Sequence, residues 1–209
     1  MFRELRERDI IFAARVISAI FHPFYLATVG LIFLFIFSYM GVLPLKYKLS
    51  VLGFVYLCTV LLPAWLIKIY RKYQGWSLIE LGSRERRAIP YVIAIVCYFL
   101  CYYILNLLHV PHFMTSIIVV ALAIQVVCAI VNLFWKISTH TAAIGGVAGA
   151  LIAFSGMFSY NPVWWLCLII IVAGILGTSR MILRQHSLSQ VVAGFLLGFV
   201  LSFLVILRF

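Results

Sequence analysis

Three short stretches of this sequence carry residue types that can bind and transform an anion. They are "KISTH" (136–140), "TSR" (178–180) and "HSLSQ" (186–190), and their reactive residues are Ser138, His140, Ser179, Arg180, His186 and Gln190. A neutral imidazole, whose reference pKa is about 6.5, can attack phosphorus while a second histidine protonates the leaving oxygen. An arginine fork can hold two phosphate oxygens at once. The three stretches therefore predict a phosphate site.

The acidic residues are few and lie only in the first half of the chain. Beyond Glu85 there is no Asp or Glu at all. This distribution argues against hydrolysis by paired carboxylates and against Mg²⁺ held by aspartates. His109 and His112 have no evident third ligand, so we interpret them as part of a turn and not as a metal site. We expect no metal and no cofactor.

The composition indicates an integral membrane protein. Of 209 residues, 66% are hydrophobic and only 10% are charged. A soluble domain does not have this balance. Because lipid offers no partners to exposed backbone groups, and the apolar runs are too long for barrel strands, the spans should be α-helices.

The fold class predicted is all-α, a polytopic membrane helix bundle with six to seven transmembrane helices and an N-terminal interfacial helix. Residues 1–17 alternate charged and apolar side chains and predict the amphipathic interfacial helix. Pro23 is expected to kink or start the first span. We expect one membrane-embedded domain over 1–209, with 71–88 as its long polar loop. The candidate spans cover about 18–39, 49–70, 90–108, 114–135, 139–158, 162–178 and 189–207.

This order of spans places the polar stretches on one membrane face, because even numbers of spans separate them. Only Lys46, Lys48 and Arg208 lie on the opposite face, which leaves thirteen of the 16 Lys and Arg residues on the face with the polar stretches. The positive-inside rule then predicts that this face is cytoplasmic. The net charge of +11 indicates attraction to membrane lipids and not binding to nucleic acid, because no basic soluble module is present.

The sequence resembles the type 2 phosphatidic acid phosphatase family of membrane lipid phosphatases, which shares its site with vanadium haloperoxidases. The family signature Ser-Arg, five residues, His, three residues, Asp is matched by "SRMILRQHSLSQ" until Gln190 replaces the aspartate. "ISTH" keeps the serine and histidine of Pro-Ser-Gly-His, with Ile137 and Thr139 in place of proline and glycine. "RERRAIP" resembles a degenerate first signature through Arg84, Arg87 and Pro90. The resemblance covers residues 80–200 and implies a multi-pass protein of the bacterial inner membrane.

The resemblance also implies a role for each matched residue. His186 would form a phosphohistidine, His140 would protonate the leaving group, and Gln190 would orient His186. The phosphoryl oxygens would be bound by Ser138 and Arg180, with Ser179, Arg84, Arg87 and Lys136 as further phosphate-binding residues. The expected partner is a lipid phosphate or diphosphate, and the chain indicates no oligomeric state.

Gln190 leaves alternatives open, because its amide carries no charge to stabilise an imidazolium. The chain is then a slow enzyme, an enzyme that uses Glu80 or Glu85 instead, or a lipid-phosphate binder without turnover. A small transporter is less favoured, because no acidic residue falls within a span. The polar residues His22, Asn106, Gln125 and Asn132 have no constellation around them in the sequence and are not predicted to belong to the site.

Overall fold

The computed structural model describes residues 2–75, 86 and 88–208. Over these residues the chain is helical and contains no strand. The elements are α1 (Phe2–Ile20), η1 (Pro23–Tyr25), α2 (Leu26–Phe37), η2 (Tyr39–Val42), α3 (Leu45–Tyr56), η3 (Leu57–Leu61), α4 (Leu62–Gln74), α5 (Ala88–Leu107), α6 (His112–Phe134), α7 (Thr139–Phe158), α8 (Val163–Ile182) and α9 (Leu188–Arg208).

Seven helical segments of the described chain are long and apolar enough to cross a membrane. The first joins α1 to α2 (Glu7–Ile36) and the second joins α3 to α4 (Leu45–Gln74), while α5 to α9 each form one. The prediction of an all-helical membrane bundle is confirmed. The sixth segment was expected to end at residue 178 but continues to Ile182 as the full helix α8.

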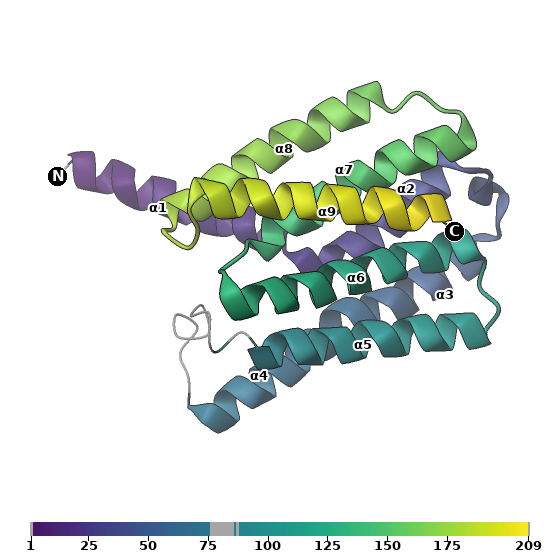
Figure 1. Ribbon diagram of the computed structural model, residues 1–209, viewed down its shortest axis with the longest axis horizontal. Helices are drawn as coiled ribbons and strands as arrows, with labels where there is room; N and C mark the ends of the chain where they lie inside the picture. Colours follow the sequence, from purple (N-terminus) through teal and green to yellow (C-terminus); the bar gives the residue numbers. More distant parts are fainter. Residues whose placement is uncertain (1, 76–85, 87, 209) are drawn as a thin grey trace.

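The polar connections lie at one end of the bundle. Figure 1 shows the end of α4, the α6–α7 connection and the α8–α9 connection at the end from which α1 projects, while the C-terminus and the α5–α6 connection lie at the other. This arrangement agrees with the placement expected from counting spans. The second segment is continuous through a π-helical turn, η3, just before Pro63, which has no N–H to donate to the helix.

The first segment is broken at Pro23, as expected, but it is not divided between residues 17 and 18. Residues 1–17 were predicted to be separate from a span starting at residue 18, yet α1 runs without interruption to Ile20. The break follows at residues 21–25, where His22 is extended and Pro23 begins the short 3₁₀ turn η1. Nothing between residues 17 and 18 stops a helix, whereas a proline disfavours helical backbone in the residue before it. The break therefore lies level with the start of α7, which η1 contacts.

Helices α7 and α9 pack against each other at backbone distance through glycines. A Cβ atom on Gly145 or Gly149 of α7 would collide with the backbone of Phe195 or Phe199. A Cβ on Gly198 of α9 would likewise overlap the carbonyl of Ala142. Small residues allow such close approach of membrane helices. This packing brings the beginning of α7 beside the beginning of α9, where the predicted reactive residues lie.

Candidate active site

Ser138 ends the α6–α7 connection and caps α7. Its side-chain oxygen accepts a hydrogen bond from the backbone N–H of Thr141 at 3.4 Å, and the residue is fully buried. A serine in this position satisfies one of the free N–H groups of the first helical turn. His140 follows in that turn and is half-buried. Both residues therefore lie where the helix dipole favours an anion, as the sequence predicted.

Arg180 lies in the last turn of α8 and is only 6% exposed. The helix ends in a Schellman motif: the backbone N–H of Gln185 donates to the carbonyl of Arg180 at 3.1 Å, and that of Arg184 to Met181 at 2.8 Å. Arg184 supplies the left-handed conformation (φ 52°) that glycine usually supplies here. This turn leads the chain from α8 into α9, and both Arg180 and His186 lie within electrostatic range of His140. Ser179 is buried, and its hydroxyl donates to the carbonyl of Ile175 at 2.8 Å.

His186 is buried and interacts directly with Gln190. Nδ1 of His186 lies 3.1 Å from Oε1 of Gln190, and the same oxygen accepts the backbone N–H of Ser187 at 3.2 Å. The backbone N–H of Ser187 can only donate, so the side-chain atom of Gln190 that faces it must be the amide oxygen. An amide oxygen can only accept, so Nδ1 of His186 must carry the hydrogen. Nε2, which is buried, then keeps the lone pair of the neutral ring. In this tautomer Nε2 is the nucleophilic nitrogen of the imidazole ring.

Gln190 also has a structural role. Ser187 directly precedes α9, and Gln190 is the third residue of that helix. A glutamine there that reaches back to the N–H of the capping residue forms half of a capping box. His186 and Gln190 were expected to share one face of a helix. In the structure His186 precedes α9, and the side chain of Gln190 extends towards the start of the helix to contact His186.

The starts of α7 and α9 are joined around these residues. The backbone N–H of Ser138 donates to the carbonyl of Gln190 at 3.4 Å. A Cβ on Gly194 would lie 2.6 Å from the carbonyl oxygen of Ser138, so only glycine allows this approach. His140 is within electrostatic range of both Arg180 and His186. Residues from three separate sequence stretches therefore meet in one cluster.

The structure adds His22, which the sequence analysis set aside. Its ring lies 5.5 Å from the ring of His140, centroid to centroid, at an interplanar angle of 78°. It is also within electrostatic range of Arg180. The backbone of Ser18, near the end of α1, is likewise within electrostatic range of the His140 ring. A lone histidine before a proline carries no sequence signal of a contact with a residue more than a hundred positions away.

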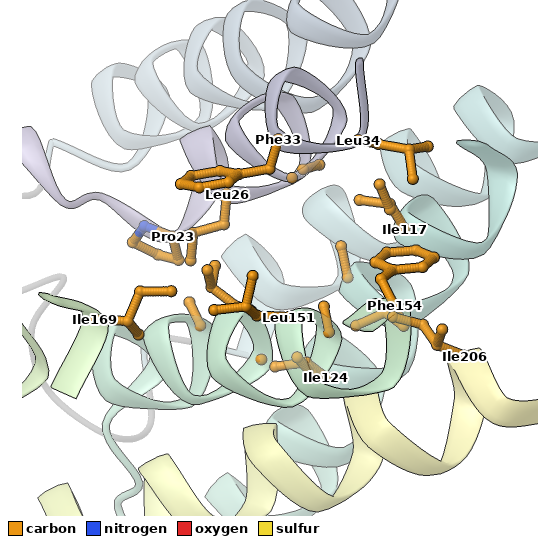
Figure 2. A pocket seen from close by; sticks show the side chains of 18 of the residues that line it. Pro23, Leu26, Phe33, Leu34, Ile117, Ile124, Leu151, Phe154, Ile169 and Ile206 are labelled. Atoms are coloured by element: carbon orange, nitrogen blue, oxygen red, sulfur yellow. The ribbon is translucent and has the colours of Figure 1, made fainter. Parts of the chain in front are cut away.

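An apolar cavity begins beside this cluster. Its lining includes Pro23 and Thr139, the neighbours in sequence of His22 and His140. From there it follows one face of α7, which contributes lining residues every three or four positions as far as Phe158. Helices α2 and α6 close it, as Figure 2 shows with Leu26 and Phe33 of α2 opposite Leu151 of α7. Since α7 has 20 residues, the lining residues are spread over about 30 Å of helix, and the cavity between them has a volume of about 80 Å³.

A family model described as the PAP2 superfamily matches residues 132–209. This match confirms the resemblance to the type 2 phosphatidic acid phosphatase superfamily. No curated protein and no solved structure was found to match the chain. The similarity of residues 132–209 to the PAP2 superfamily indicates phosphatase activity on phosphate esters, and together with the seven apolar helices of the described chain it indicates a multi-pass membrane protein.

Most of the predicted site residues fall within the PAP2 match. These are Lys136, Ser138, His140, Ser179, Arg180, His186 and Gln190. Lys136 is half-buried in the α6–α7 connection, two residues before Ser138. Arg84 and Arg87, and the alternative acids Glu80 and Glu85, lie outside the described residues. His22 and Ser18 lie outside the PAP2 match but inside the cluster.

Proposed function

We propose that this protein is a metal-independent phosphatase that hydrolyses a lipid phosphate or lipid diphosphate through a phosphohistidine intermediate. The observation that carries the proposal is the orientation of His186, whose Nδ1 faces Oε1 of Gln190 at 3.1 Å and whose Nε2 keeps its lone pair. Arg180 and His140 lie in the same cluster, within electrostatic range of one another. The proposal thus assigns the nucleophile, the acid and the phosphate-binding cation to residues of one cluster.

The reaction takes two steps. In the first, Nε2 of His186 attacks phosphorus and the bond from phosphorus to the leaving oxygen breaks. His140 donates a proton to that oxygen, while Arg180 and the N-terminus of α7 stabilise the phosphoryl oxygens. In the second, water attacks the phosphohistidine, His140 takes the proton of the water, and inorganic phosphate leaves. Throughout, Gln190 accepts the hydrogen of Nδ1 and fixes the tautomer of His186.

The cavity along α7 supports a lipid as the substrate. It begins next to His22 and His140, and its labelled lining side chains in Figure 2 are all apolar. Its lining residues are spread over about 30 Å of α7, which is close to the hydrocarbon thickness of a bilayer. Its volume is about 80 Å³, so a long tail would enter by displacing the lining side chains. The phosphate would bind at the polar end and the acyl or prenyl tail would extend between α2, α6 and α7.

The function is tested with phosphate esters and diphosphates that differ only in tail length, in the presence of a chelator. Each CH₂ group that enters an apolar site contributes about 0.8 kcal/mol, so kcat/KM for a hexadecyl ester should exceed that for a butyl ester by at least about tenfold. Ala150→Leu, which fills the cavity far from the cluster, should remove most of this advantage. Ala64→Leu, on the exposed face of α4, is the matched control. Equal rates for both tail lengths would contradict a lipid substrate.

The alternative function is a lipid-phosphate binder without turnover, and the neutral amide of Gln190 is the observation that favours it. Gln190→Glu distinguishes the two, because glutamate keeps both the reach and the capping box while adding a negative charge beside Nδ1 of His186. A hydrogen bond to a charged group is stronger by about 1 kcal/mol, so kcat should rise by about fivefold to tenfold. Gln190→Leu should lower it. Turnover absent from wild type and from Gln190→Glu would support the binder.

We also propose that the site faces the cytoplasm of a bacterial inner membrane. The proposal rests on the excess of Lys and Arg at the end of the bundle that holds the cluster.

A further inference from the structure

We propose that His22 is a positioning residue for His140, so that the break in the first membrane segment belongs to the active site. The inference rests on the proposed function, because it assigns His22 a role in the proton transfer by His140. The evidence is the contact between the two rings, which pack edge to face with centroids 5.5 Å apart. His22 lies outside the region of the PAP2 match, which begins at residue 132.

The break at residues 21–25 places His22 against His140. The two rings meet edge to face at an interplanar angle of 78°, so the ring of His22 restricts rotation of the ring of His140. The backbone of Ser18, in the last turns of α1, is also within electrostatic range of His140. The direction in which the acidic nitrogen of His140 faces therefore depends on its contact with His22.

His22 is itself held in place. Its Nδ1 accepts the backbone N–H of Phe24 at 3.4 Å, which makes it the N-cap of η1. The ring also packs edge to face on Phe24, with centroids 4.7 Å apart. Its position against His140 thus follows from the local backbone, because Pro23 fixes the turn that begins η1. A mobile surface histidine could not align another side chain in this way.

A purely structural role would be capping of η1, and two substitutions separate the roles. His22→Asn keeps a capping acceptor for the N–H of Phe24 but removes the ring that contacts His140. His22→Phe keeps a ring of similar shape but removes the acceptor. If His22 positions His140, Asn should lower kcat/KM much more than Phe does, whereas Phe should lower the thermal stability more than Asn does. The reverse order for kcat/KM would overturn the inference.

The decisive measurement compares two leaving groups. An alkyl phosphate needs a proton on its leaving oxygen, whereas a p-nitrophenyl phosphate leaves as a stable anion and needs little help. For His22→Asn we expect kcat/KM to fall by about 10- to 100-fold with the alkyl ester and by much less with the aryl ester, because misplacing an acid affects only the step that uses it. This ratio reports steps up to the first irreversible one, so hydrolysis of the phosphohistidine does not mask the effect.

The outcomes are distinct. His140→Ala should show the same preference for the aryl ester, and it serves as the reference. An equal loss with both esters, or no loss with either, would overturn the role of His22 while leaving the proposed phosphatase intact. A wild-type protein that hydrolyses neither ester would overturn the proposed function and this inference with it.

Discussion

His186→Ala should lower phosphate release from a long-chain lipid phosphate by more than about 10³-fold, since removal of a nucleophile leaves only binding and electrostatic stabilisation. The effect should be on kcat, because Arg180 and the N-terminus of α7 still bind the phosphate. The reason lies in the geometry: Oε1 of Gln190 fixes the tautomer of His186, so that Nε2 carries the lone pair that attacks phosphorus in the proposed reaction. Steady-state release of inorganic phosphate measures the change.

His112→Ala is the matched control, because His112 is an exposed histidine at the opposite end of the bundle. It should retain wild-type turnover. A second readout follows the intermediate: brief incubation of wild type with substrate labelled in its phosphate should leave acid-labile label on the protein, and His186→Ala should carry none. Undiminished phosphate release by His186→Ala would show that the roles are assigned wrongly.

The helices and the cluster follow from features that can be seen in a single sequence. Apolar runs of span length predict the bundle, because lipid permits few other structures. The spacing of Ser138, His140, Arg180 and His186 carried the family resemblance, which the PAP2 match confirms. The close packing of α7 on α9 also has a local pattern, because Gly145 and Gly149, like Gly194 and Gly198, are four residues apart on one helix. These features are local or repeat along one helix, and such patterns are readable.

Contacts between distant parts of the chain were not readable. His22 touches His140 only because the first segment breaks beside the start of α7, and a break at Pro23 could have faced any neighbour. The cavity is lined by Ala, Gly, Leu and Phe, the same residue types that face lipid elsewhere, so composition cannot distinguish the two surfaces. The capping box at Ser187 and Gln190 was readable, but it requires knowing that α9 begins at Leu188. The His22–His140 contact and the cavity both depend on how helices distant in the sequence pack together, and local sequence patterns do not report that packing.

Arg180→Gln should lower kcat/KM for a lipid phosphate by about 10²- to 10³-fold, the usual cost of losing one group that stabilises transition-state charge. Arg180 is only 6% exposed, and its electrostatic neighbours include the imidazoles of His22 and His140. A buried guanidinium group next to imidazole rings is costly to keep charged, and a bound anion would offset this cost. The surroundings of Arg180 therefore favour binding of an anion. Arg180→Lys should recover only part of the loss, because an ammonium group cannot make two parallel hydrogen bonds.

The same residue should couple phosphate binding to stability. Inorganic phosphate should raise the melting temperature of the wild-type protein, since a ligand that binds only the folded state stabilises it, and this shift should shrink in Arg180→Gln. Arg184→Gln is the control, because Arg184 is an exposed arginine one helical turn further along the chain and should change neither activity nor the shift. An equal phosphate shift in wild type and Arg180→Gln would mean that the anion binds elsewhere. Arg180 would then have only a structural role at the end of α8, and the phosphate site would lie outside the cluster.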